Sequence, residues 1–187
     1  MKIQEIKNAC WLESGAVDCE VLFEGETEFV PYTAMQDDTA QTGQHIWQEL
    51  QSGKWGAPAP FTVTPELIAA AKEGKKREIE AWRREQEAKP FIFEWKGRNW
   101  NAGPDSMARL SPVVMASKSS AARDVMTWGD AGNQQVKMSM PELEELAAAM
   151  AQASMDRSNE IYLRQREMKE VLSSLEDLGS IRAFNVE

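Results

Sequence analysis

Histidine, the side chain that most often serves as a general base near neutral pH, occurs once in this 187-residue sequence, at His45. His45 stands beside Ile46 and Trp47 in a predicted helix, and no serine lies in the Gly-x-Ser-x-Gly setting of a nucleophile. The sequence therefore gives little support to a catalytic triad. We expect His45 to be an ordinary structural or surface residue.

The carboxylates occupy positions that helices use for structural reasons. Asp37 and Asp38 precede a helical pattern, where a carboxylate can accept hydrogen bonds from free backbone N–H groups. Glu142, Glu144 and Glu145 fit the acidic first turn of a longer helix. No glycine-rich phosphate loop and no EF-hand spacing occurs. We therefore predict no catalytic residue, no cofactor and no metal, and hence a protein that is not an enzyme.

The two cysteines, Cys10 and Cys19, lie nine residues apart on what we predict to be adjacent strands. They would pair in a secreted protein, whereas a reducing cytosol favours two free, buried thiols that pack as small hydrophobes. We favour the free thiols, because no apolar run of signal-peptide length follows Met1 and no stretch approaches the ~20 residues of a membrane span. No CxxC motif or Cys/His cluster indicates zinc.

The net charge of −9 is concentrated in the first third of the chain. Residues 1–60 hold three lysines against ten carboxylates, a balance of −7, and residues 61–187 hold 18 basic against 20 acidic residues. Proteins that neutralise phosphates need clustered Lys and Arg, so this acidity argues against a nucleic-acid partner. A hydrophobic fraction of 42% suffices for a packed core. We expect a cytosolic protein that works by binding.

Aromatic side chains are the remaining signal, because Trp and Arg are favoured at protein interfaces. Five aromatics cluster within nineteen residues: Trp82, Phe91, Phe93, Trp95 and Trp100. We expect the first three of these to form the core beneath a helix. Trp95, Arg98 and Trp100 lie at a predicted hairpin tip, and Trp55 lies in a loop rich in Gly and Pro. These four are the candidate partner-binding residues, and burial in a core is the alternative for the tryptophans.

Residues 1–58 are predicted to form a small antiparallel β-meander followed by one helix. Three strand-like runs are joined by short turns with glycine, at Ala9–Leu12, Cys19–Phe23 and Thr27–Tyr32. A helical pattern begins after Asp38 and ends at Gly53, which fits the C′ position. A unit of this size has a marginal core, so we expect it to lean on the rest of the chain or on a partner.

Residues 62–187 are predicted to form a mainly helical domain with two β-hairpins and a long C-terminal helix, which makes the fold class α+β. The predicted signals are a helix from Thr64-Pro65 to Pro90, a hairpin at Phe91–Trp100, a short helix capped by Asp105-Ser106, and a hairpin at Met126–Met138. A capping box at Ser139–Glu142 begins the long helix, which we expect to end near Leu175 to Gly179. Its apolar stripe slips by four residues near Arg157, and we favour packing against residues 65–88 over a projecting coiled coil.

Several segments together resemble a domain of uncharacterised function that is common in tailed-phage genomes. They are Lys76–Arg83, Pro90–Gly97, Ala108–Leu110, Trp128, Met140–Leu143 and Arg164–Arg166. The front of the chain resembles phage tail-fibre assembly and tail-fibre-associated proteins, through Val30–Thr33, Asp37-Asp38, Gly43 and Gly53–Gly56. Together these resemblances cover most of the chain.

The resemblance implies a phage protein encoded near tail fibres. Chaperones of that family bind the distal tip of a trimeric fibre and help it to fold and trimerise in the host cytoplasm, and some remain on the virion tail. The expected partner is a trimeric tail-fibre protein, with other tail or baseplate proteins as further candidates and no nucleic acid or membrane. We expect a non-enzymatic tail-fibre assembly chaperone. A structural component of the tail fibre or baseplate and a small glycan-cleaving enzyme are the alternatives.

Overall fold

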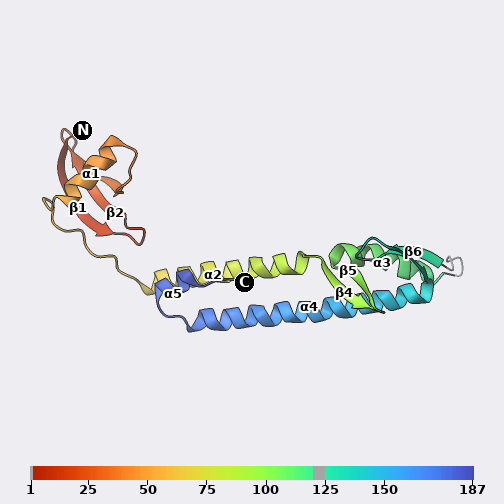
Figure 1. The fold of residues 1–187 in the computed structure, drawn as a ribbon. Helices are drawn as coiled ribbons and strands as arrows, with labels where there is room; N and C mark the ends of the chain where they lie inside the picture. Colours follow the sequence, from red (N-terminus) through yellow and green to blue (C-terminus); the bar gives the residue numbers. More distant parts are fainter. Residues whose placement is uncertain (1, 120–124) are drawn as a thin grey trace. The chain divides into compact units, whose positions relative to one another are not determined.

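The computed structural model of the chain describes residues 2–119 and 125–187. These residues form two compact units, one ending at Thr64 and the other beginning at Pro65, and each has a hydrophobic core of its own. A three-stranded meander with one helix is followed by helices and two β-hairpins (Figure 1). The predicted α+β class is therefore confirmed.

The first unit is an antiparallel sheet in the order β1-β2-β3, with helix α1 packed on one face. Its elements are β1 (Ile3–Trp11), β2 (Val17–Phe23), β3 (Val30–Ala34) and α1 (Gln41–Gln51). Because successive side chains of a strand point to opposite faces, alternate residues of β2 enter the core. Val17 and Val21 meet Ile46 and Leu50 of α1 there, which places the predicted apolar face of this helix against the sheet.

The strands differ in extent from those predicted. β1 begins at Ile3, well before the predicted start at Ala9. Within the strand, Asn8 takes a left-handed conformation with φ of +55°, and the register with β2 shifts beside it. This bulge interrupts the alternation of apolar and polar residues on which a strand prediction depends. β3 starts and ends later than predicted.

Helix α1 follows a turn that Asp38 organises. Ala40 is the N-cap residue and its side chain makes no cap bond, whereas Asp38 Oδ1 accepts a hydrogen bond from Ala40 N at 2.8 Å. Asp38 Oδ2 accepts another from Tyr32 Oη at 3.0 Å. A Cβ on Gly43 would overlap the Asp38 carboxylate and lie 2.5 Å from Tyr32 Oη, so a larger residue there would have to displace these two side chains from their hydrogen bond. The predicted helix cap at Asp37 or Asp38 is therefore wrong, although Asp38 fixes the entry to the helix.

The first unit extends beyond residue 58, where its end was predicted. Trp11 N donates to Ala59 O at 2.9 Å, and Ala59 N donates to Ala9 O at 2.8 Å. The chain thus pairs in parallel with the edge of β1 before it leaves the unit. The division falls between Thr64 and Pro65.

The second unit is built along one long helix. Its elements are α2 (Pro65–Ala88), β4 (Phe91–Trp95), β5 (Arg98–Ala102), α3 (Pro104–Ser117), β6 (Val125–Gly129), β7 (Gln135–Ser139), α4 (Met140–Ser174) and α5 (Leu178–Ala183). Helix α4 packs on α3 and the hairpins over one part of its length and on α2 over the other, and α5 returns to α2 (Figure 1). The long helix therefore packs within the chain, as predicted.

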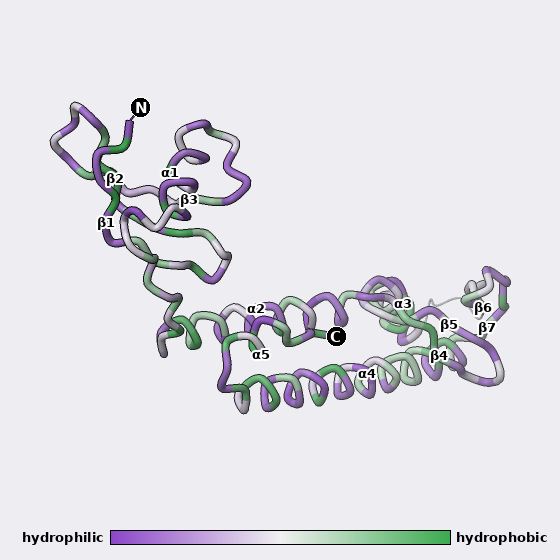
Figure 2. The backbone as a smooth tube through the Cα atoms, turned by 60° about the vertical axis from the view of Figure 1, so that its left-hand side comes forward, coloured by the Kyte–Doolittle hydropathy of each residue, from purple (hydrophilic) through white to green (hydrophobic). Residues whose placement is uncertain are grey.

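The buried side of α4 follows an 11-residue repeat. Steps of three, four and four residues relate its inward positions: Leu143, Leu146, Met150, Ser154, Arg157, Ile161, Gln165, Met168 and Leu172. Eleven residues in three turns give a period close to that of a straight helix, so the stripe stays on one side without marked supercoiling. Figure 2 shows hydrophobic and hydrophilic segments alternating along α4. No helix among the described residues, α4 included, is apolar over the length that a bilayer requires.

The long helix α4 begins and ends at residues with distinct caps. The capping box is confirmed, because Ser139 Oγ accepts from Glu142 N and the Glu142 carboxylate accepts from Ser139 N at 2.8 Å. At the other end α4 stops at Ser174 with Leu175 as its C-cap, which agrees with the predicted end near Leu175. The end at Gly179 is wrong, because Asp177 caps the separate helix α5. Val171 is 45% exposed, whereas Leu172 in the next position faces the core.

The short helix α3 begins differently from the prediction. Its N-cap is Gly103 rather than Asp105 or Ser106, and Pro104 occupies the first turn, where its fixed φ suits a helix. Gly103 has φ of +119°, and a Cβ there would lie 3.1 Å from the Pro90 Cα. Glycine is therefore required where β5 turns into α3.

Truncation of a buried leucine on α4 tests this packing. Leu146 is fully buried at 0% exposure and Leu163, on the same helix, is 57% exposed. Leu146→Ala leaves a cavity and is expected to lower the free energy of unfolding by about 2–5 kcal/mol. Leu163→Ala is expected to change it by less than about 0.5 kcal/mol. Chemical denaturation followed by far-UV circular dichroism measures both, and equal losses would contradict the assigned inward face.

Candidate binding site at the two hairpins

The structure brings three of the four predicted binding residues together on one hairpin. Trp95, Arg98 and Trp100 belong to β4 and β5, which join through the two-residue loop Lys96-Gly97. Both loop residues have positive φ, +50° and +69°, which is the geometry of a type I′ turn and matches the twist of the strands. The predicted hairpin is confirmed, and its tip is the natural starting point for a binding site.

Trp100 lies beneath this tip, in the core of the second unit. Its exposure is 2%, and it packs with Leu110, Leu143 and Leu146. Its Nε1 donates to Trp95 O at 3.3 Å, which satisfies the one polar group of the ring. Trp100 is therefore a core residue, and it supports the tip instead of presenting its ring to a partner.

Trp95 and Lys96 form the accessible part of the tip. The half-buried Trp95 ring meets Trp100 edge to face, with ring centroids 6.2 Å apart. Lys96 Nζ lies 4.4 Å from the Trp95 ring centroid and 2.5 Å from Glu145 Oε2 of α4. A cation over an indole face and an ion pair to the long helix together hold the tip in place.

An ion pair joins the two hairpins. Arg98 Nη1 donates to Asp130 Oδ2 at 2.6 Å, and Asp130, in the β6–β7 loop, is only 6% exposed. Asp130 Oδ1 accepts from Gly132 N at 2.9 Å and from Gln134 N at 2.8 Å. The Arg98 hydrogen bond, followed by that from Gln134, lowers the pKa of the Asp130 carboxyl below its ordinary value. A buried carboxylate with these partners is a firm bridge between the loops.

The sequence analysis missed Asp130 as part of a site. It sits in a run of turn-forming residues, Asp-Ala-Gly-Asn, and its partner Arg98 is 32 positions earlier. No short-range sequence pattern connects Asp130 with Arg98. A second tie, from Ala131 N to Asn99 O at 2.9 Å, is made by backbone atoms and leaves no residue-type signal at all.

A hollow of about 310 Å³ opens beside this bridge. Its walls come from β5, α3, β6 and the β6–β7 loop, namely Asn101, Ser106, Arg109, Thr127, Trp128, Gly129, Asp130 and Asn133. The surroundings combine amide, hydroxyl, guanidinium and indole groups. Such a mixture suits binding of a polar ligand rather than acid–base chemistry, because the single carboxylate is already paired with Arg98.

Trp55, the fourth predicted residue, belongs to the first unit. Its half-buried ring packs against that core, and its Nε1 donates to Glu49 Oε2 at 2.8 Å. This bond, with one from Lys54, lowers the pKa of the Glu49 carboxyl. Lys54 Nζ also lies 4.4 Å from the Trp55 ring centroid. Trp55 thus closes the end of α1 and has no part in the hairpin site.

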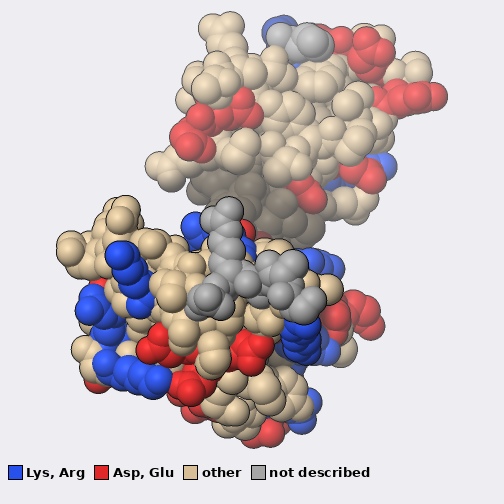
Figure 3. Space-filling view, turned by 90° about the vertical axis from the view of Figure 1, so that its right-hand side faces the viewer, with Lys and Arg blue, Asp and Glu red and all other residues tan. Residues whose placement is uncertain are grey.

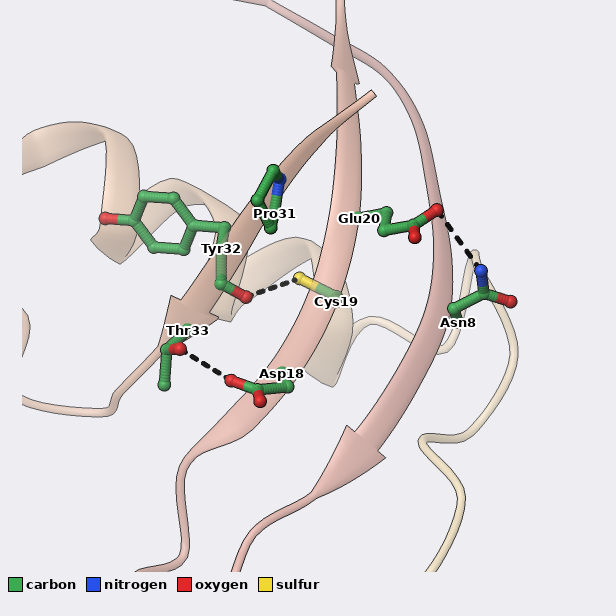
Figure 4. A pocket seen from close by; sticks show the side chains of 7 residues that line it. All are labelled: Asn8, Asp18, Cys19, Glu20, Pro31, Tyr32 and Thr33. Atoms are coloured by element: carbon green, nitrogen blue, oxygen red, sulfur yellow. Dashed lines mark hydrogen bonds between the residues drawn. The ribbon is translucent and has the colours of Figure 1, made fainter. Parts of the chain in front are cut away.

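The outer face of the first sheet carries a second hollow, of about 330 Å³ (Figure 4). Here the polar side chains bond to one another across the strands. Thr33 Oγ1 donates to Asp18 Oδ1 at 2.5 Å, and Asn8 Nδ2 donates to Glu20 Oε2 at 3.2 Å. Such cross-strand pairs stabilise a sheet, and they occupy hydrogen-bonding atoms that a ligand would otherwise contact.

His45 lies on α1, where its Nε2 is 3.8 Å from Glu49 Oε1 and its side chain is 45% exposed. It is a surface residue, as predicted. Within the described part of the chain, no three His, Cys, Asp or Glu side chains gather in a way that could hold a metal ion.

The second unit is a helical scaffold that carries two β-hairpins. A family model described as "Domain of unknown function (DUF4376)" matches residues 70–183, which is more than half of the chain. The chain belongs to this family. The matched stretch holds the hairpins and the hollow, and it leaves the first unit outside. No curated protein and no solved structure matches the chain.

The ion pair between the hairpins makes stability depend on pH. Because the pKa of folded Asp130 lies below its ordinary value of 3.8, the stabilisation is fully present above that value and is lost as the pH falls through the lowered pKa. Asp130→Asn is therefore expected to lower the melting temperature at neutral pH, with a difference from the wild type that shrinks below about pH 4. Thermal unfolding at a series of pH values measures this. Asp156→Asn, at an exposed site on α4, is the matched control, and an equal effect there would contradict the bridge.

Both cysteines are free thiols, and the burial of Cys19 leads to a prediction about its reactivity. Burial, then the neighbouring Asp18, raises the pKa of the Cys19 thiol to about 11, and its Sγ donates to Tyr32 O at 3.5 Å. Thiolates are the reactive form, so Cys19 should be almost inert near neutral pH. In a Cys10→Ser variant treated with iodoacetamide at about pH 8, folded protein is expected to keep Cys19 unmodified by mass spectrometry. Denatured protein should label fully, and equal labelling of both samples would refute the assignment.

Proposed function

We propose that this chain is a non-enzymatic assembly chaperone for a phage tail fibre, which binds the fibre tip and promotes its folding and trimerisation. The proposal rests on two resemblances and on one structural observation. The front of the sequence resembles tail-fibre assembly proteins, and the rest resembles a domain of uncharacterised function that is common in tailed-phage genomes. The structural observation is the braced hairpin tip at Trp95, Lys96 and Arg98.

The tip has the properties of a protein-binding surface. Trp and Arg dominate the binding energy of many interfaces, because a ring or a guanidinium covers much area with specific geometry. Lys96 is tied to Glu145 and Arg98 to Asp130, so these side chains need little ordering when a partner arrives. Side chains that are already ordered lose less entropy on binding.

The acidity of the first unit supports a second contact surface for the fibre. Its charge of −7 lies on a unit that folds around its own core, and Asp and Glu prevail among the charged side chains visible on it in Figure 3. The visible face of the second unit carries both signs. A field of one sign raises the association rate with a partner of the opposite sign. A fibre tip with basic side chains fits this unit.

The second candidate function is a structural component of the tail fibre or baseplate. It is favoured by apolar side chains on the outward side of α4, where Met155 is 65%, Leu163 57% and Tyr162 46% exposed. Large exposed apolar side chains close together mark interaction sites, and a permanent assembly would keep them covered. The two candidates share a partner and differ in whether the chain stays on the virion.

Co-expression with the tail-fibre protein encoded beside it tests the chaperone. The wild-type chain is expected to raise the yield of soluble, trimeric fibre and to co-purify with it, as measured by size-exclusion chromatography with light scattering. Lys96→Glu reverses a charge at the tip and is expected to weaken the complex about tenfold or more. Lys137→Glu, at an exposed lysine on β7, is the matched control.

Equal yields of trimer with and without the chain would end the chaperone proposal. Mass spectrometry of purified virions separates the two candidates, because a structural component is present in fixed stoichiometry and a transient chaperone is absent.

A further inference from the structure

Another hollow, of about 630 Å³, opens on the first unit between the β1–β2 turn, the β3–α1 loop and helix α1. Its lining includes Gly15 of the turn, Met35 and Asp37 of the loop and Trp47 of α1, and we call it the Trp47 hollow. A Cβ on Gly15 would meet no atom within 4 Å, so the turn leaves its side of the hollow open. The volume lies within the range of about 300–1,000 Å³ for ligand sites, which is ample room for one large side chain of a partner.

Two apolar side chains line the Trp47 hollow. Met35 follows the buried Ala34 at the end of β3 and is 46% exposed. The half-buried Trp47 packs against the core of the first unit, and its ring meets the Trp11 ring edge to face, with centroids 5.9 Å apart. This contact holds the indole in place, whereas the flexible thioether of Met35 adapts to what it touches. Accessible apolar side chains that lie close together mark interaction sites.

Asp37 gives the Trp47 hollow a negative charge that no described residue neutralises. Its carboxylate is exposed and makes no hydrogen bond or ion pair with any described residue. The neighbouring Asp38 differs, because its carboxylate accepts hydrogen bonds from Ala40 N and Tyr32 Oη. None of the residues that line the hollow is a Lys, an Arg or a His. The carboxylate of Asp37 is therefore available to a cation from outside the chain.

The lysines of the first unit are all paired with carboxylates outside this hollow. The three ion pairs are Lys2 with Glu24, Lys7 with Glu20 and Lys54 with Glu49. Ten carboxylates against three lysines leave the surroundings of the hollow with the charge of −7 noted above. A field of this sign attracts a cationic partner and repels a phosphate or a carboxylate. Charge complementarity therefore favours a basic side chain as the occupant.

We propose that the Trp47 hollow receives an arginine side chain of a protein partner, with the guanidinium plane against the Trp47 ring and its N–H groups donating to the Asp37 carboxylate. A guanidinium is planar, stacks on aromatic rings and presents paired donors to a carboxylate, whereas an ammonium is a compact, strongly hydrated charge. The aliphatic part of the arginine packs along Met35. The inference rests on the proposed function only for the identity of the partner, and it uses no residue of the hairpin tip.

Two-dimensional ¹H–¹⁵N NMR of the full chain tests the site. The probe is a glycine pentapeptide with capped ends and arginine at its centre, and its twin carries citrulline, which has nearly the same shape without the charge. The arginine peptide is expected to shift the indole N–H resonance of Trp47 in a saturable way. It is expected to bind at least about fivefold more tightly than the citrulline peptide, because only the cation gains from both the ring and the carboxylate.

Two pairs of variants assign the binding to the Trp47 hollow. Asp37→Asn is expected to weaken the arginine peptide about threefold and to leave the citrulline peptide unchanged, whereas Glu28→Gln, at an exposed carboxylate outside the hollow, changes neither. Met35→Lys places a cation inside the hollow and is expected to abolish binding of the arginine peptide. Val30→Lys adds the same charge at a valine of β3 that is 45% exposed and lies outside the hollow, so binding should persist.

Equal binding of the arginine and citrulline peptides overturns the proposal, because the hollow would then take a neutral group. Tighter binding of a lysine peptide overturns it as well, and so does binding that Met35→Lys leaves intact. Absence of a saturable shift at Trp47 up to about 10 mM peptide has the same consequence. The peptide measurements contain no fibre and the co-expression contains no peptide, so failure of the arginine site and failure of the chaperone proposal are observed separately.

Discussion

Burial of one stripe of a 35-residue helix is the constraint on which the second unit depends. An isolated helix is marginal in water, and a two-stranded hairpin is more so, so neither would persist without an apolar surface to cover. Helix α4 supplies that surface along its whole length. Its N-terminal half receives α3 and the two hairpins, and its C-terminal half receives α2, onto which α5 folds back. The straight 11-residue period keeps every one of these partners on the same side of the helix.

Polar bridges then select one arrangement among those that burial alone would permit. Arg157 stands over the Phe91 ring, 4.7 Å from its centroid, and donates to Gln86 O at 3.1 Å, which fixes β4 and the end of α2 against α4. Arg83 donates to the buried Gln165 at 3.1 Å farther along the same contact. At the hairpins Arg98 has the corresponding role, because its ion pair with Asp130 joins the two loops.

Short-range sequence patterns predicted much of the fold correctly and little of the candidate site. The capping box at Ser139 and the turn at Lys96-Gly97 were predicted correctly, since each depends on a few adjacent residues with one favourable geometry. The start of β1 and the cap of α3 were not. A bulge at Asn8 hid the strand period, and a glycine whose conformation is set by the approach of Pro90 replaced the expected polar cap. In both places a contact from another element overrode the local preference.

The sequence by itself determined the order and type of the elements from β1 to α4 and the acidity of the first unit, because composition and short-range periodicity carry these properties. Only the tertiary structure decided that Trp100 is core and that Arg98 reaches Asp130 across 32 residues. The physical reason is that exposure and pairing depend on which faces α4 covers. A one-position rotation of that helix would bury Val171 instead of Leu172, and it would rearrange everything that packs on it.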